Sequence, residues 1–265
     1  MKASKGVCAL LAGSFLLSVS AVAIAADDPP VHIDGLPENL VKHAADIQKG
    51  LGSDTDPDTA RGVYFASTVW PMTYRKLRVC FFGGTNEARS VIAQYAKEWE
   101  RPEHAMKLDF GKDGKFRTCK KGGKVEMQIR VGFDKAGYWS ALGADSVVSV
   151  TQDEQSLNLN GFENLTRDKT AYWQARTIRH EFGHAMALMH EHQNPKSSCE
   201  EEFDWDKIYK LLSGPPDNWS KEVIDFNMRK LSGPDVVATD FDKASVMLYQ
   251  FPKEFYKNGT KANCY

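Results

Sequence analysis

The chain has 265 residues, of which 42% are hydrophobic and 26% are charged, as in an ordinary globular protein. This length fits one large domain or two small lobes that share a core. The formal net charge of −1 gives no reason to expect nucleic acid or an acidic membrane as a partner.

The N-terminus predicts a secretory signal peptide over residues 1–25. Lys2 and Lys5 form a short basic region, and the apolar run that follows ends in "AIA" before "ADDPP". This order is typical of export, and we expect cleavage near Ala25. The alternative is an uncleaved membrane anchor, since the run is about long enough to span a bilayer. The small residues at its end favour cleavage, and therefore a secreted or periplasmic protein.

Residues 26–62 are polar and rich in Asp, Pro and Gly, which predicts an N-terminal extension or a short pro-segment. The hydrophobic pattern beyond them predicts strands and amphipathic helices. We expect strands at 77–82, 125–133, 146–151 and 156–160, and helices at 86–100 and about 168–188. Later residues are irregular, so the order predicts an α/β lobe followed by a lobe of loops and short helices.

Four cysteines remain after the expected cleavage, at positions 80, 119, 199 and 264. An even number in an exported chain indicates two disulfides, and three pairings are possible. We expect Cys80–Cys119 and Cys199–Cys264, because each bond closes within one half of the chain. A cysteine zinc site is the alternative, but no two of these residues have C-x2–4-C spacing.

The stretch "HEFGHAMALMHEH", residues 180–192, holds four of the seven histidines of the chain. His180 and His184 are four residues apart, so on a helix their imidazoles lie on one face, one turn apart. That spacing suits two nitrogen ligands of one zinc ion. Glu181 follows the first histidine, where its carboxylate can reach a zinc-bound water. The pattern H-E-x-x-H is a metallopeptidase signature.

His190 extends this motif only if the chain turns back. Six helical steps place it roughly 240° around the helix from His184, so the helix must end between them. The longer pattern H-E-x-x-H-x-x-G-x-x-H has Gly at this turn, because Gly tolerates left-handed backbone angles. Here Ala187 takes that position, which raises the cost of the turn without forbidding it. His192 has no place in the pattern, and we expect it not to bind metal.

A second motif lies near the C-terminus, where residues 240–251 read "DFDKASVMLYQF". This looks like the S-x-M-x-Y methionine turn of astacins, and "HEHQNP" looks like the segment after their third histidine. Upstream, "LRVCFFGGTNEARSVIAQYAKEWE", "IRVGFDKAGYWSALG" and "SLNLNGF" are similar to their catalytic domain. The chain therefore resembles the astacin family of the metzincin clan, in particular its bacterial astacin-like members, over about residues 63–251.

The resemblance implies a metzincin-like α+β fold for a metallopeptidase domain at 63–265. It implies an N-terminal lobe, about 63–190, with a twisted mixed sheet and two long helices, and a smaller irregular lobe, about 191–265. The active-site cleft would run between them, bordered by an antiparallel edge strand within 146–160. Substrate would bind there extended, as an added strand. The family's pro-segment offers an Asp to the zinc, and only Asp34 is a weak match.

Motif and resemblance together predict a zinc-dependent endopeptidase. One catalytic zinc ion would be held by His180, His184 and His190, with Glu181 as general base and acid. The resemblance makes Tyr249 the residue that stabilises the developing oxyanion and Met247 the residue packed beneath the zinc. We expect a monomer that acts on proteins or peptides, without nucleic acid or membrane partners after signal cleavage. The alternatives are an exported zinc-binding interaction module without catalysis, and a zinc hydrolase of non-peptide bonds. Substrate preference is not indicated.

Overall fold

The structure is a computed structural model that describes residues 35–41, 62–100, 106–215 and 217–264. The predicted signal peptide, Asp34 and most of the predicted extension lie outside the described residues. None of the helices in the described part of the chain has the length and apolar character that crossing a membrane requires.

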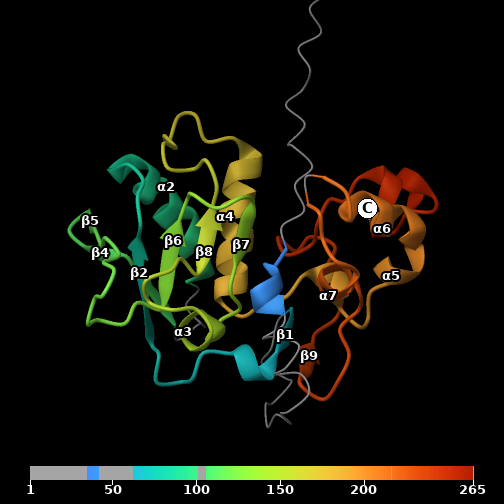
Figure 1. Cartoon of the computed structure of the whole chain (residues 1–265), viewed down its shortest axis with the longest axis horizontal. Helices are drawn as coiled ribbons and strands as arrows, with labels where there is room; N and C mark the ends of the chain where they lie inside the picture. Colours follow the sequence, from blue (N-terminus) through green and yellow to red (C-terminus); the bar gives the residue numbers. More distant parts are fainter. Residues whose placement is uncertain (1–34, 42–61, 101–105, 216, 265) are drawn as a thin grey trace, which may run out of the picture. The chain divides into compact units, whose positions relative to one another are not determined.

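A five-stranded sheet with the order β3-β2-β6-β8-β7 occupies the first part of the described chain (Figure 1). Its strands are β2 (Lys76–Phe81), β3 (Lys107–Asp109), β6 (Ile129–Gly132), β7 (Tyr138–Ser140) and β8 (Leu157–Leu159). The first four in this order are parallel to their neighbours, and β7 runs antiparallel to β8 at one edge. Parallel strands are usually covered on both faces, and β6 is buried along its whole length.

Two long helices accompany the sheet, α2 (Asn86–Ala96) and α4 (Tyr172–Ala185). Helix α4 contacts α2, β7 and β8, so the sheet and both helices share one core (Figure 1). The side chain of Thr85 caps α2 by accepting a hydrogen bond from the N–H of Ala88. The α+β fold with a mixed sheet and two long helices is therefore confirmed.

The other described elements are short. They are the helices α3 (Asp145–Val148), α5 (Cys199–Glu202), α6 (Trp205–Leu212) and α7 (Lys221–Met228), the strands β1 (Val63–Phe65), β4 (Gly111–Lys112), β5 (Lys115–Phe116) and β9 (Val236–Ala238), and the 3-10 helices η2 (Ala66–Thr68), η3 (Lys97–Trp99), η4 (Glu191–Gln193), η5 (Lys253–Phe255) and η6 (Gly259–Lys261). Strand β1 pairs antiparallel with β9, and β4 with β5.

Two further apolar clusters lie outside the sheet core. One is formed by α5, α6, α7 and the C-terminal residues, and it includes the buried Phe203 and Phe251. The other joins residues far apart in sequence, among them Leu36, Leu142 and Met189. The second cluster matters for the site, because it ties the described N-terminal segment to residues beside the histidines.

Both expected disulfides are present. The Cα atoms of Cys80 and Cys119 are 5.0 Å apart, and those of Cys199 and Cys264 are 5.2 Å apart, each pair with its sulfurs bonded. The first bond ties β2 to the residues that follow β5, and the second lies in the core of α5 to α7.

The strand predicted at 146–151 is wrong, because this stretch contains α3 and a turn. The buried side chain of Arg130 explains the difference: its Nη2 donates to the carbonyls of Ser146 and Val150, and its Nε donates to the carbonyl of Glu154. These carbonyls therefore face one cation and not a partner strand. Burial lowers the pKa of Arg130 to about 10, so it stays charged at neutral pH.

The antiparallel edge strand is consequently β7, and not a strand within 146–160. In that range only β8 forms, and it lies inside the sheet between β6 and β7. The second long helix is also shorter than predicted, since it begins at Tyr172 and ends at Ala185.

Candidate metal centre

Three buried histidines meet at one point. His180 and His184 lie on the last turns of α4, and His190 comes from the chain beyond its end. The ligand atoms that the three imidazoles offer all lie within 4.8 Å of one another. The structure therefore brings together the three histidines that the sequence singled out.

The turn that returns His190 is built on Ala187, whose φ is +79°. Its N–H donates to the carbonyl of His184 at 2.8 Å, and the N–H of Leu188 donates to the carbonyl of Gly183 at 3.0 Å. This pair of bonds is the Schellman motif, which ends helices with one left-handed residue that is usually Gly. The chain thus makes the turn that the sequence required, with an alanine in the left-handed position.

Each imidazole is oriented through its Nδ1. The Nδ1 of His180 lies 2.8 Å from the carbonyl oxygen of Val246. The Nδ1 of His184 lies 2.7 Å from the carbonyl oxygen of Leu188. A carbonyl oxygen only accepts, so both Nδ1 atoms carry the proton and both Nε2 atoms keep the lone pair that a metal needs.

His190 follows the same rule through a side chain that the sequence reasoning missed. Its Nδ1 lies 3.2 Å from Oε1 of Gln193, whose Nε2 donates to the carbonyls of Phe226 and Arg229. Those two bonds turn the amide oxygen toward His190. The only signal in the sequence is the position of Gln193, three residues after the histidine.

The donor set fits zinc. Two nitrogens bound to one tetrahedral zinc at about 2.0–2.1 Å lie about 3.3 Å apart. The Nε2 atoms of His184 and His190 are 3.1 Å apart. Among the described residues the metal-binding group consists of these three imidazoles, and three protein ligands with one open position is the arrangement of catalytic zinc.

The side chain of Met247 packs against Gly183 on α4. A Cβ added to Gly183 would lie 2.3 Å from the Sδ of Met247, so a larger residue at position 183 would require the side chain of Met247 to move. The ring of Tyr249 then follows, 5.0 Å from the ring of His180 and 4.7 Å from that of His190. Both residues of the second motif thus lie at the histidine cluster.

The solved structures include a similar protein, myroilysin. One of its structures matches at 30% identity with a TM-score of 0.61, and the match covers 75% of this chain and 88% of that one. Myroilysin is an astacin-family zinc metalloprotease. The chain belongs to the astacin family of zinc metalloproteases. It is accordingly a zinc metalloendopeptidase, as the sequence predicted.

Other comparisons add less. A second myroilysin structure matches at 28% identity with a TM-score of 0.49, covering 77% of this chain and 84% of that one. High choriolytic enzyme 1, a hatching enzyme zinc-protease from the medaka fish Oryzias latipes, matches at 14% identity with a TM-score of 0.42, covering 72% and 78%. No family model and no curated protein sequence matches.

In this astacin-family chain Glu181 is buried beside the first histidine, with 1% of its surface exposed. Burial raises the pKa of the Tyr138 hydroxyl on β7, and the charge of Glu181 raises it further.

His192 does not belong to the metal-binding group among the described residues. It is buried, its ring lies 5.2 Å from that of His190, and its Nε2 lies 3.0 Å from the carbonyl of Asn227. Glu191, between the two histidines, accepts from Nδ2 of Asn194 and from the N–H of Asp242. Burial raises the pKa of Glu191, although these hydrogen bonds oppose the rise.

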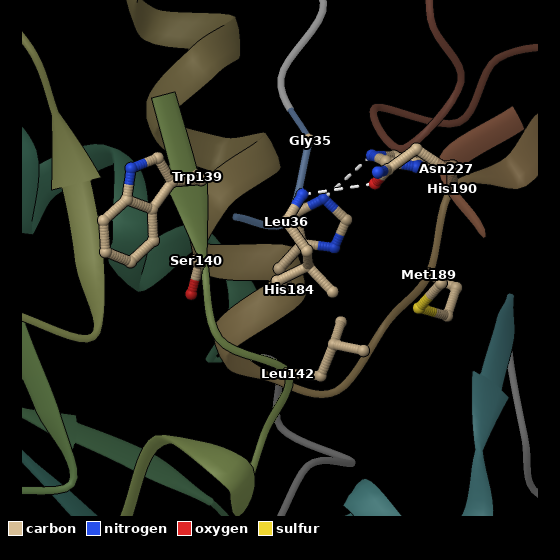
Figure 2. Close-up of a pocket in the computed structure, with 9 residues that line it drawn as sticks. All are labelled: Gly35, Leu36, Trp139, Ser140, Leu142, His184, Met189, His190 and Asn227. Atoms are coloured by element: carbon tan, nitrogen blue, oxygen red, sulfur yellow. Dashed lines mark hydrogen bonds between the residues drawn. The ribbon is translucent and has the colours of Figure 1, made fainter. Parts of the chain in front are cut away.

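A small pocket borders His184 and His190, and residues of the N-terminal segment help to line it (Figure 2). The N–H of Leu36 donates to Oδ1 of Asn227 at 3.2 Å, and the side chain of Leu36 packs in the cluster with Met189. Asn227 is a residue that the sequence reasoning missed, because nothing in its neighbourhood in the sequence marks it.

Proposed function

We propose that the chain is an exported endopeptidase in which His180, His184 and His190 hold one catalytic zinc ion. The observation that carries this proposal is the orientation of the imidazoles, whose Nδ1 atoms are held by protein oxygens while the Nε2 atoms converge. When bound, zinc polarises the scissile carbonyl and lowers the pKa of the attacking water.

Glu181 moves the proton in this proposal. Its carboxylate takes a proton from the attacking water and delivers it to the leaving amine. Its place supports the assignment, because it follows His180 directly on α4 and is buried with 1% of its surface exposed.

Tyr249 assists from the other side. Its ring lies within 5.0 Å of the rings of His180 and His190, so its hydroxyl is in reach of an oxygen that develops negative charge there. Met247 has no chemical role in the proposal, since it is an apolar residue packed against Gly183.

Substrates are protein or peptide chains bound in extended form along β7. That strand ends the sheet order and pairs with β8 alone among the described strands. An edge strand offers main-chain groups to an extended peptide whatever its side chains are. The two disulfides and the signal-like N-terminus support export, and we propose a monomer divided into lobes at about 63–190 and 191–265.

Residues 26–62 form a pro-segment in this proposal, because Gly35 and Leu36 line the pocket beside His184 and His190. Leu36 is 9% exposed and contacts an apolar cluster, whereas Asn39 is exposed. Leu36→Asp should expel the segment and raise peptidase activity severalfold, while Asn39→Asp, with the same added charge, should not. Equal activity of Leu36→Asp and the parent would show that this segment does not restrict access.

The catalytic assignment is tested by Glu181→Gln. The control is Glu98→Gln, which changes a carboxylate that pairs with Arg179, a residue on the same helix as Glu181. Glu181→Gln should keep its zinc and lose about 10²–10⁴-fold in casein hydrolysis, the usual contribution of general base catalysis. Glu98→Gln should match the parent. Hydrolysis by Glu181→Gln at the parental rate would overturn the mechanism.

A further inference from the structure

Three consecutive carbonyls of the methionine turn are bound by groups that belong to the histidine segments. The carbonyl of Val246 accepts from Nδ1 of His180 at 2.8 Å, and that of Met247 accepts from the N–H of Glu191 at 2.9 Å. The carbonyl of Leu248 accepts from Nη2 of Arg176. The turn is therefore fixed to the metal centre at every peptide unit from 246 to 248.

Arg176 differs from the other two donors, because it is neither in the zinc motif nor next to it. It lies four residues before His180 on α4, so the two side chains share one face of the helix, one turn apart. Its guanidinium spans the distance from α4 to the turn and makes a charge-assisted hydrogen bond, the stronger kind. No part of the proposed chemistry uses this residue.

The bond has a specific consequence, because the carbonyl of Leu248 belongs to the same rigid peptide plane as the N–H of Tyr249. A donor that fixes this plane also fixes the N–Cα bond of Tyr249, and so the point from which its side chain leaves the backbone. The ring that it directs lies 5.0 Å from His180 and 4.7 Å from His190. We propose that Arg176 is a positioning residue that holds Tyr249 at the zinc site through the carbonyl of Leu248. This inference rests on the proposed role of Tyr249.

The size of the effect follows from the way it acts. Removing a direct donor to a developing oxyanion lowers kcat by about 10²–10³-fold. Arg176 only restricts where such a donor lies, so Arg176→Met should lower kcat by about 10-fold, less than the loss of the donor itself. KM should stay within about twofold, because the residue does not touch the peptide.

The test is a double-mutant cycle with Arg176→Met, Tyr249→Phe and the combined variant, all with measured zinc content and thermal stability. If Arg176 acts through Tyr249, Arg176→Met lowers kcat about 10-fold in the parent and less than about twofold in Tyr249→Phe. Arg176→Lys, which keeps a cationic donor, should recover part of the rate and serves if the methionine variant folds poorly. Arg179→Met is the matched control, since Arg179 lies on the same helix but pairs with Glu98.

The outcomes separate this inference from the proposed function. An equal loss from Arg176→Met in both backgrounds, or parental kcat in Arg176→Met, would overturn the positioning role. Parental activity of Tyr249→Phe would remove the role of Tyr249 and this inference with it. It would leave the zinc site and Glu181 untouched, because the Glu181→Gln variant tests those separately.

Discussion

The helix turn at Ala187 offers a pair of substitutions with opposite expected results. Ala187 has φ +79° and is 1% exposed, and its methyl group faces Gly143, where an added Cβ would lie 2.7 Å from it. Ala187→Gly removes the methyl group and the strain together, whereas Ala187→Val keeps the strained angle and adds bulk on the crowded side. We expect the first to be tolerated and the second to fail.

The expected change in the free energy of unfolding of Ala187→Gly follows from one stabilising and two destabilising effects. A left-handed non-glycine residue costs about 1–2 kcal/mol, which Ala187→Gly would recover. Losing one buried methyl group costs about 0.8 kcal/mol, and the greater freedom of glycine in the unfolded chain costs about 0.4–1 kcal/mol. The free energy of unfolding of Ala187→Gly should therefore stay within about 1 kcal/mol of the parent. Ala187→Val adds overpacking of about 1–3 kcal/mol to greater strain, so it should lose about 3 kcal/mol.

Urea unfolding of the zinc-free proteins measures the stabilities, and zinc content with casein hydrolysis measures the site. Ala187→Gly should bind zinc and hydrolyse casein at the parental rate or above it. Ala187→Val should bind zinc more weakly, because the turn that returns His190 is disturbed. If Ala187→Val matched the parent, or if Ala187→Gly lost more than about 2 kcal/mol, the account of this turn would be wrong.

Further substitutions test the packing around the site. Gly183→Ala should lower the midpoint of thermal unfolding, because its methyl group would lie 2.3 Å from Sδ of Met247. This clash should outweigh the helix propensity of Ala, which favours the substitution by about 1 kcal/mol. A raised midpoint would contradict this packing. Arg130→Met should lower the free energy of unfolding by about 3–5 kcal/mol in urea, because the buried carbonyls that Arg130 binds lose their donor. A loss below about 1 kcal/mol would mean that the stretch 146–151 does not depend on Arg130. Replacing Cys199 and Cys264 by Ser opens a loop of 65 residues and should lower the free energy of unfolding by about 4 kcal/mol. Urea unfolding of this variant and of the parent with its disulfides intact measures the difference.

Much of the site was predictable from the sequence because it depends on local spacing. The face shared by His180 and His184 follows from the helical repeat alone. The turn before His190 was also required by spacing, and only its mechanism, a Schellman motif with alanine at the left-handed residue, needed the structure. The disulfide pairs followed from their number and their position within each half of the chain.

The errors and omissions came from contacts between residues distant in sequence. Residues 146–151 look like a short strand, but Arg130 binds the carbonyls of Ser146 and Val150 from 16 and 20 positions away. Gln193 orients His190 only because α7 and the residues after it hold its amide. Arg176 and Asn227 carry no local mark at all, since their partners lie at Leu248 and Leu36. Long-range polar partners of this kind have no periodic signal in one sequence.

The central claim is that a single zinc ion at His180, His184 and His190 makes the chain a peptidase. The most direct measurement strips the purified protein with a chelator, returns zinc in steps, and records bound zinc and casein hydrolysis together. We predict no hydrolysis by the zinc-free protein, a linear recovery, and a plateau at one zinc per chain. Hydrolysis that persists without zinc, or that never returns when the site is filled, would contradict the claim.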